Sequence, residues 1–136
     1  MTIDFSSVMV DDLDKAISFY IGILGLVKGA DIPMEEYRFV TVYSPEKPDG
    51  AQLILQPTNF PPSKTYQKAL FDAGLPATSL ITKDINAEVR SLKSKGVVFR
   101  GEPRDAGVIL TVVFEDTCGN LVNLVQPKMM PPSGNR

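Results

Sequence analysis

Few side chains in this chain could carry out chemistry, and histidine is absent from all 136 residues. Without histidine the chain lacks the commonest general base near neutral pH and the commonest transition-metal ligand. A Ser-His-Asp or Cys-His catalytic site within the chain is therefore excluded. The remaining candidates are one cysteine, a few acidic clusters and an amide, Asn123, in the middle of the apolar segment LVNLVQP.

The acidic and thiol groups give no clear sign of catalysis. Three aspartates within residues 11–14 mark an expected helix start, where Asp12 is suited to capping. The adjacent glutamates at 35–36 would point to opposite faces of a strand, so they cannot share one task. Cys118 lies in an expected turn beside two acidic residues, which disfavour a reactive thiolate. These groups do not predict a catalytic centre.

Composition and charge describe an ordinary globular chain, with 43% hydrophobic residues, 22% charged residues and a net charge of −2. Acidic and basic residues are interspersed without a basic stripe, so we expect no nucleic-acid partner. The apolar runs are shorter than the roughly 20 residues of a membrane span, and we expect no membrane partner. The segment MTIDFSSV lacks a signal-peptide pattern and a single cysteine excludes an intramolecular disulfide, so we expect a cytoplasmic protein.

Hydrophobic periodicity then indicates the elements that would position any site. The first half predicts a strand at 5–10, a helix from Asp12 to Gly25, and strands at 36–44 and 51–57. A second helix follows, with Ser63 as its candidate N-cap and Gly74 at its end. The segment TSLITKDINAEVRSLKSKGVVF predicts a strand, a helix, a glycine and another strand. The last strand is LVNLVQP.

Three markers recur at a nearly constant offset, which predicts two copies of one supersecondary unit. The pairs are Asp12 and Asp84, 72 residues apart, Gly25 and Gly96, 71 apart, and Gln56 and Gln126, 70 apart. We therefore predict a single domain over 1–136, with unit one at about 3–57, a connecting helix at about 61–74, unit two at about 76–127 and a C-terminal tail at 128–136.

The order strand-helix-strand-strand-strand, twice, resembles the vicinal oxygen chelate superfamily, which includes glyoxalase I, extradiol dioxygenases and bleomycin-resistance proteins. The segment VDDLDKAISFYIGILGL is similar to the first-helix signature of that family. FEDTCGNLVNLVQP is similar to its last-strand signature, with Thr117 and Cys118 in place of the usual Pro-Asp. The resemblance implies an α+β fold in which two βαβββ units form a cupped mixed-sheet half-barrel.

The resemblance also implies four inward-facing positions at which the metal-dependent members hold ligands. Here these positions carry side chains that bind metals weakly or not at all. They are Phe5, Leu53, Ala77 and Asn123, with Gln52 or Ile54 open as alternatives to Leu53 if the register differs by one residue. We therefore expect no metal and no cofactor. The usual metal-dependent glyoxalase, epimerase and dioxygenase activities are not expected.

Alternation along the strands predicts a mostly apolar cavity, as is common for small-molecule sites. Its expected lining is Phe5, Ser7, Met9, Leu53, Ala77, Ser79 and Asn123. The strand at 36–44 adds either the face of Tyr37, Phe39, Thr41 and Tyr43 or the face of Arg38, Val40 and Val42. On the second face Arg38 would be able to hold a carboxylate or phosphate. The helix around 66–71 is expected either to cover the mouth of the cavity or to serve as a rigid connector.

The leading hypothesis is metal-independent binding of a small organic molecule, as in the bleomycin-resistance branch that the chain resembles. One alternative is a lyase or isomerase with non-standard chemistry. Another is a structural or protein-binding module whose cavity is filled. The resemblance implies a homodimer with its cavities near the interface, and pairing would also cover exposed sheet edges.

Overall fold

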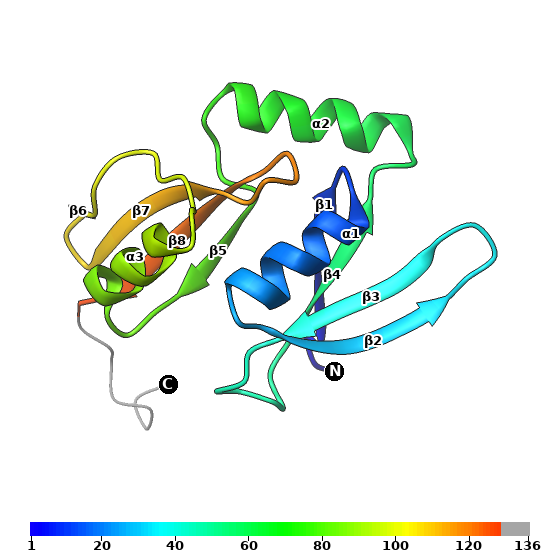
Figure 1. Ribbon diagram of the computed structural model, residues 1–136, viewed down its shortest axis with the longest axis horizontal. Coiled ribbons are helices and arrows are strands. Elements are labelled where there is room, and N and C mark those ends of the chain that lie inside the picture. The colour runs from blue at the N-terminus through cyan, green and yellow to red at the C-terminus, as the bar shows by residue number, and fades with distance from the viewer. Residues whose placement is uncertain (129–136) are drawn as a thin grey trace.

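The computed structural model describes residues 1–128, which form two βαβββ units joined by a helix (Figure 1). The first unit contains β1 (Phe5–Val10), α1 (Leu13–Ile17), a π-helical continuation η1 (Ser18–Ile23), β2 (Val27–Pro33), β3 (Arg38–Tyr43) and β4 (Gln52–Pro57). The connecting helix is α2 (Pro61–Asp72). The second unit contains β5 (Thr78–Ile81), α3 (Ile85–Ser94), β6 (Arg104–Asp105), β7 (Ile109–Glu115) and β8 (Leu121–Pro127).

Each unit folds around its own four-stranded mixed sheet, and neither sheet closes into a barrel. The strand orders are β1-β4-β3-β2 and β5-β8-β7-β6, with the first and last strand of each unit parallel. The predicted α+β class with two βαβββ units is therefore confirmed. The tail predicted over 128–136 lies, apart from Lys128, outside the described residues. Within residues 1–128 we find no helix long and apolar enough to cross a membrane.

The two unit helices begin as their sequence predicts. The Asp12 carboxylate accepts a hydrogen bond from the Lys15 backbone N–H at 3.1 Å, and Asp84 accepts one from Ala87 at 3.0 Å. Each cap satisfies one of the N–H groups that a helix start leaves without a partner. Gly25 then ends the first helix at a φ of 79°, which glycine adopts without strain.

Two local predictions were wrong. Ser63 does not cap α2, because the helix starts earlier with prolines at its first two positions and Phe60 as its N-cap. Proline fits there since the first N–H groups of a helix need no intrahelical partner. The segment GVVF forms no strand and contributes only an isolated bridge between Phe99 and Phe114. The short β6 is instead the edge strand of the second sheet, next to β7.

The hydrophobic core lies between the helices and one face of each sheet. Ala16, Phe19 and Tyr20 of α1 and η1 share one buried cluster with the strand residues Val8, Val10, Val40, Val42 and Leu55, and the centroid of the Phe19 ring also lies 6.1 Å from that of Phe114 in the second unit. In the second unit α3 packs its buried side chains against the corresponding strand residues Val112, Phe114, Val122 and Leu124. These alternating positions leave the opposite face of each sheet free of a unit helix.

A buried hydrogen-bond network at the turn between β7 and β8 joins the two units and α2. One Asp116 carboxylate oxygen accepts from the Tyr20 hydroxyl of η1 at 2.6 Å. The Asn120 amide donates to that oxygen and to the Met9 carbonyl at the end of β1. Gln67 of α2 donates to the carbonyls of Met9 and Cys118 at 2.9 and 3.0 Å. The turn therefore fixes α2 and the second unit relative to β1.

Candidate functional site

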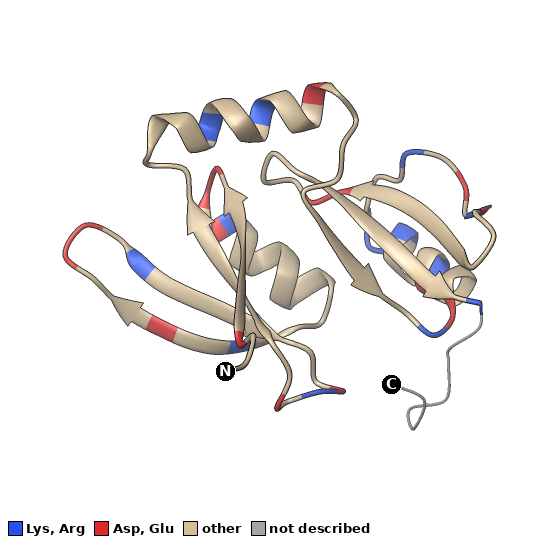
Figure 2. Ribbon diagram, turned by 180° about the vertical axis from the view of Figure 1, so that it is seen from behind, with Lys and Arg blue, Asp and Glu red and all other residues tan. Residues whose placement is uncertain are grey.

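The face of the first sheet that lies opposite α1 carries the predicted lining residues Phe5, Ser7 and Met9. Register and alternation put nine side chains there, which together we call the open face. They are Phe5, Ser7, Met9, Phe39, Thr41, Tyr43, Gln52, Ile54 and Gln56. In Figure 2 the strands of this sheet lie in front of α1, so this face is toward the viewer. It combines apolar and aromatic side chains with hydroxyl and amide groups.

Two of the predicted lining residues touch each other on the open face. The rings of Phe5 and Phe39 meet edge to face, with centroids 6.1 Å apart. Such aromatic pairs form rigid apolar walls. Ser7 and Met9 share this face with Phe5, as strand alternation predicts.

Arg38 lies on the other face of β3, and its predicted place in the cavity is corrected. Val40 and Val42 are buried against α1, so Arg38, which alternates with them, points to the same side. There its guanidinium binds Asp31 through two hydrogen bonds of 2.7 and 3.2 Å. These bonds, with one from Lys28, lower the pKa of the Asp31 carboxyl. Arg38 is thus engaged in a surface ion pair.

Leu53 is likewise not on the open face, because it packs against the core while Gln52 and Ile54 lie on the side of Phe5. The prediction of Leu53 treats the Gln-Pro pairs at 56–57 and 126–127 as equivalent, but the two strands are displaced by one residue relative to that alignment. Gln56 lies on the open face, whereas Gln126 faces α3 and accepts a hydrogen bond from the Ile85 backbone. The last strands therefore correspond at an offset of 71 residues, and the counterpart of Asn123 is Gln52.

In the second sheet the remaining predicted residues lie along β5 and β8. Ser79 is directly opposite Asn123 in the parallel pair, on the face that points away from α3. Ala77 directly precedes β5, and its partly buried side chain packs against the hydrophobic core. The register places Phe5 opposite Gln52 and Ser79 opposite Asn123, so the two sheets present equivalent positions.

Each sheet carries a threonine bonded to the amide at this equivalent position. The Thr41 hydroxyl donates to Oε1 of Gln52 at 2.6 Å, and the Thr111 hydroxyl donates to Oδ1 of Asn123. The sequence predicted Asn123 but not its threonine partner, since the two lie on different strands. The recurrence of Thr41 at Thr111, 70 residues later, is the signal that would have revealed both pairs.

A hollow of about 290 Å³ lies at the end of the open face nearest α2. Its lining combines side chains of the open face with the β2–β3 hairpin and the segment that leads into α2, namely Met9, Glu36, Tyr37, Gln56, Pro57, Asn59, Phe60 and Ser63. The start of α2, rather than its middle at 66–71, therefore borders the hollow. Sequence reasoning placed Met9 and, on one of its alternatives, Tyr37 at the cavity and missed the rest.

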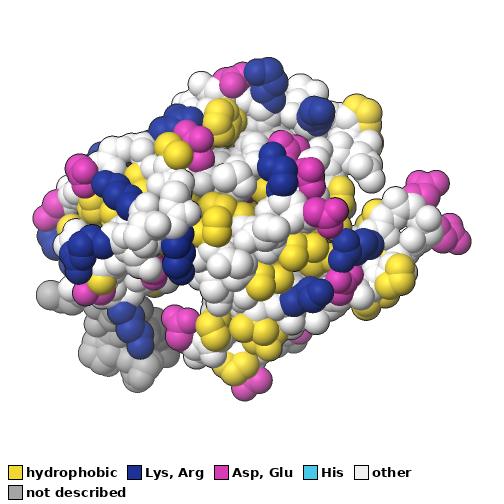
Figure 3. All heavy atoms as spheres, in the orientation of Figure 1, with side chains coloured by type: hydrophobic (Ala, Val, Ile, Leu, Met, Phe, Trp, Pro, Cys, Tyr) yellow, Lys and Arg dark blue, Asp and Glu magenta, His cyan; other side chains and the backbone are white. Residues whose placement is uncertain are grey.

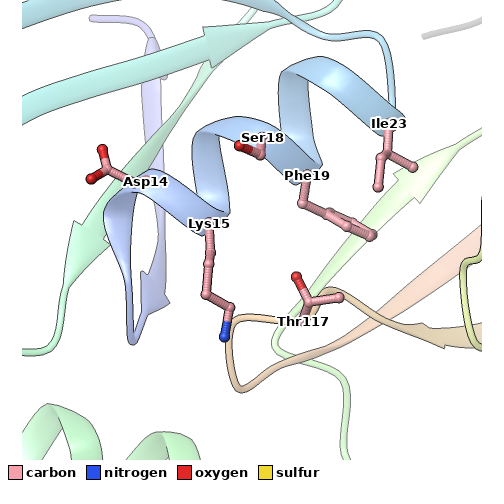
Figure 4. A pocket seen from close by; sticks show the side chains of 6 residues that line it. All are labelled: Asp14, Lys15, Ser18, Phe19, Ile23 and Thr117. Atoms are coloured by element: carbon pink, nitrogen blue, oxygen red, sulfur yellow. The ribbon is translucent and has the colours of Figure 1, made fainter.

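A second hollow of about 320 Å³ lies between α1, η1 and the turn at 116–120. Figure 4 shows Lys15 and Thr117 at this junction, with the Phe19 ring between the helix and the turn. It borders the hydrogen-bond network that joins the units. Because Phe19 belongs to the core, this hollow is a gap at the junction of the units and does not continue the open face.

The donor atoms of these faces do not fit a transition-metal ion. The carbonyl oxygens of Gln52 and Asn123 already accept hydrogen bonds from threonines, and both are neutral. Zinc, iron and related ions need several nitrogen, sulfur or charged oxygen ligands. Across residues 1–128 no three Cys, Asp or Glu side chains gather in a way that would hold a metal ion.

Cys118 is not suited to nucleophilic chemistry either. Its side chain is fully buried in the turn, and burial together with the charge of Asp116 raises its pKa to about 12. A thiol with such a pKa stays protonated at neutral pH and is a poor nucleophile.

The paired βαβββ units, each with one sheet face free of its helix, define the class of protein. A family model described as the Glyoxalase/Bleomycin resistance protein/Dioxygenase superfamily matches residues 2–124. The chain belongs to this superfamily, and the family resemblance noted in its sequence is confirmed.

Individual relatives agree with this assignment. The chain is 45% identical over 126 residues to the uncharacterized protein YurT of Bacillus subtilis (strain 168), covering 93% of this chain and 99% of that protein. It is 28% identical to TnmS3, an antibiotic binding protein from Streptomyces sp. CB03234, with a TM-score of 0.75 and coverage of 94% and 97%. UcmS2 has the same fold, with a TM-score of 0.80 at 23% identity and coverage of 92% and 97%.

Proposed function

We propose that this protein binds a small organic molecule on the open face of the first sheet, and that binding requires no metal ion. The observation that carries the proposal is a sheet face with apolar, aromatic and amide side chains that runs into a hollow of about 290 Å³. Small-molecule sites are typically concave and apolar, with a few polar groups that orient the ligand. Phe5 and Phe39 supply the apolar wall, while Gln52, held by the buried Thr41, supplies a polar group.

Metal independence follows from the residue types at the equivalent positions of the two sheets. Phe5 and Gln52 in the first sheet and Ser79 and Asn123 in the second include no charged or imidazole ligand. Their amide oxygens are held by threonines and are not free to turn toward an ion. The ligand is therefore held by apolar contacts and hydrogen bonds alone.

One relative, TnmS3, supports a binding role. TnmS3 binds an antibiotic, and at 28% identity over nearly the whole length it is a meaningful guide to ligand size and kind. We propose that the present chain sequesters an organic compound of comparable character. Catalysis is not needed to explain any feature of the open face.

We also propose that the protein acts in the cytoplasm as a homodimer, without a nucleic-acid partner. Large apolar side chains are exposed on both sheets, including Phe5 at 52%, Ile32 at 49% and Ile81 at 67%. A second copy would cover such surface and deepen the site. Charges of both signs are interspersed over both units in Figure 2, and the face shown in Figure 3 has the same mixture with hydrophobic side chains between. A buried single cysteine suits a reducing compartment.

A thermal-shift screen of EDTA-treated protein with hydrophobic acids and aromatic antibiotics tests the binding proposal. A ligand that binds the native state raises the melting temperature by mass action. The site is then checked with Phe5→Asp, which should weaken a hit by roughly tenfold because it removes the aromatic wall. The matched control is Val98→Asp, since Val98 is 54% exposed, as Phe5 nearly is, but lies in the second unit. Equal effects of the two variants, or hits that require added metal, would contradict the proposal.

A further inference from the structure

The two threonine–amide pairs have a fixed orientation that bears on what the ligand must look like. In the first pair the Thr41 hydroxyl oxygen accepts from the Ala30 backbone N–H at 2.8 Å. A hydroxyl has one proton, and here it goes to Oε1 of Gln52. Gln52 therefore presents its carbonyl oxygen to Thr41 and its NH₂ group to the other side.

The first pair is built into the sheet by a bulge in β2. The register between β2 and β3 shifts between Lys28 and Asp31, which turns the Ala30 N–H toward Thr41. At Gly29 a Cβ atom would lie 2.5 Å from both Oε1 of Gln52 and Oγ1 of Thr41. Any other residue at this position would displace the pair, so the glycine and the bulge together hold it.

The amide nitrogens are available to a ligand. Within residues 1–128, neither Nε2 of Gln52 nor Nδ2 of Asn123 donates a hydrogen bond to the protein. In the same part of the chain no buried side-chain nitrogen or oxygen lacks a partner, so both nitrogens contact solvent. Thr111 holds Asn123 by its carbonyl oxygen in the same way as Thr41 holds Gln52. Each sheet thus presents an oriented NH₂ group beside apolar side chains.

We propose that the NH₂ group of Gln52 is the hydrogen-bond donor for the ligand on the open face, and that the ligand is an apolar molecule bearing carbonyl, carboxylate or similar acceptor oxygens. This inference rests on the proposed binding function and specifies its ligand class. An amide donor is neutral and serves neutral and anionic acceptors, whereas an ammonium group has no lone pair to offer it. Thr41 is a positioning residue, since it acts through the Gln52 amide.

Fluorescence titration with two probes tests the donor role, using 2-naphthoate as the acceptor and 2-naphthylmethylammonium as the cation. The full-length protein should bind naphthoate at least about tenfold more tightly, because a hydrogen bond to a charged group has about that effect. Gln52→Glu should remove this preference and leave the ammonium probe unchanged or tighter. The matched control, Asn86→Asp, makes the same amide-to-acid change at an exposed site on α3 and should keep the preference. Unfolding midpoints of all variants establish that they fold.

A second variant and a third probe separate the possible failures. Thr41→Val keeps the shape but frees the Gln52 amide to turn, so it should reduce the preference for naphthoate while uncharged 2-methylnaphthalene binds as before. If 2-methylnaphthalene binds but the two charged probes bind equally, the donor inference is overturned and the binding function stands. A different result would be a preference of the protein for the ammonium probe that is lost in Glu36→Gln. This result would assign the selectivity to Glu36 at the hollow and would also overturn the donor inference. If none of the three probes binds, both proposals fail.

Discussion

Replacing Tyr20 with phenylalanine tests the network that joins the two units. The Tyr20 side chain is fully buried, and its hydroxyl donates to Asp116 at 2.6 Å. The variant removes this one hydrogen bond to a charged group, which costs about 2 kcal/mol of unfolding free energy. The ring keeps its edge contact with Phe19, and Asp116 keeps its bonds from Cys118 and Asn120. The loss is therefore confined to the hydroxyl.

Urea denaturation measures this effect. With a slope of about 2 kcal/mol per molar urea, Tyr20→Phe should lower the midpoint by about 1 M. The control is Tyr66→Phe, because Tyr66 is 63% exposed on α2 and should change stability by less than about 0.5 kcal/mol. If the two variants have the same midpoint, the buried hydroxyl does not hold the units together as described.

The pH dependence gives a second, independent readout of Tyr20. Burial, strengthened by the nearby Asp116 carboxylate, raises the pKa of Tyr20 well above its usual value. The folded protein therefore keeps the phenol protonated where the unfolded chain ionises it, above about pH 10. The contribution of Tyr20 is complete below pH 10 and falls by about 1.4 kcal/mol per pH unit above it. The stability gap between wild type and Tyr20→Phe should shrink above pH 10, and a constant gap up to pH 11 would refute the reasoning.

Three further predictions concern Gly29, Gln67 and Cys118. Gly29→Ala should lower the unfolding free energy by about 1–3 kcal/mol and weaken naphthoate binding, because the added methyl group overlaps the Thr41–Gln52 pair. Unchanged stability and affinity would show that the pair is not constrained. Gln67→Leu should cost about 1–3 kcal/mol in urea denaturation, since it leaves the buried Asn120 Oδ1 without its donor and removes one of the two hydrogen bonds to each of the Met9 and Cys118 carbonyls; a cost near zero would mean that water replaces the amide. The Cys118 thiol, with its pKa raised to about 12, should react with a disulfide reagent at pH 8 only after unfolding; rapid reaction of native protein would contradict its burial.

Much of the fold follows from local sequence signals. The caps at Asp12 and Asp84, the glycines that end the helices and the alternation of the strands are each set by neighbouring residues. These signals are strong because one side chain or one backbone conformation decides each of them. Their repetition was enough to predict two units of the same architecture.

The site was harder to predict because its register depends on pairing between distant strands. A one-residue slip moves a strand's side chains to the opposite face, and the matching Gln-Pro pairs led to Leu53 in place of Gln52. The side of β3 that carries Arg38 was open for the same reason. The bond between Tyr20 and Asp116 spans 96 residues, so no local pattern indicates it.

The hollow is also a product of tertiary structure. It combines Met9 and Gln56 of the first sheet with Tyr37 from a hairpin and Phe60 from the lead into α2. No single stretch of sequence contains these residues together. Strand alternation from the family positions predicted a mostly apolar cavity in general terms, while the borders of the hollow depend on how α2 is held by Gln67.

The most direct test of the central claim is a ¹H–¹⁵N NMR titration of EDTA-treated protein with 2-naphthoate. We predict saturable shifts concentrated in β1, β3 and β4 and in the side-chain NH₂ of Gln52, without any added metal. Shifts concentrated instead around Lys15 and Thr117, in the hollow beside α1, would place the ligand elsewhere. Shifts that appear only after a metal ion is added, or no saturable shifts at all, would contradict metal-independent binding on the open face.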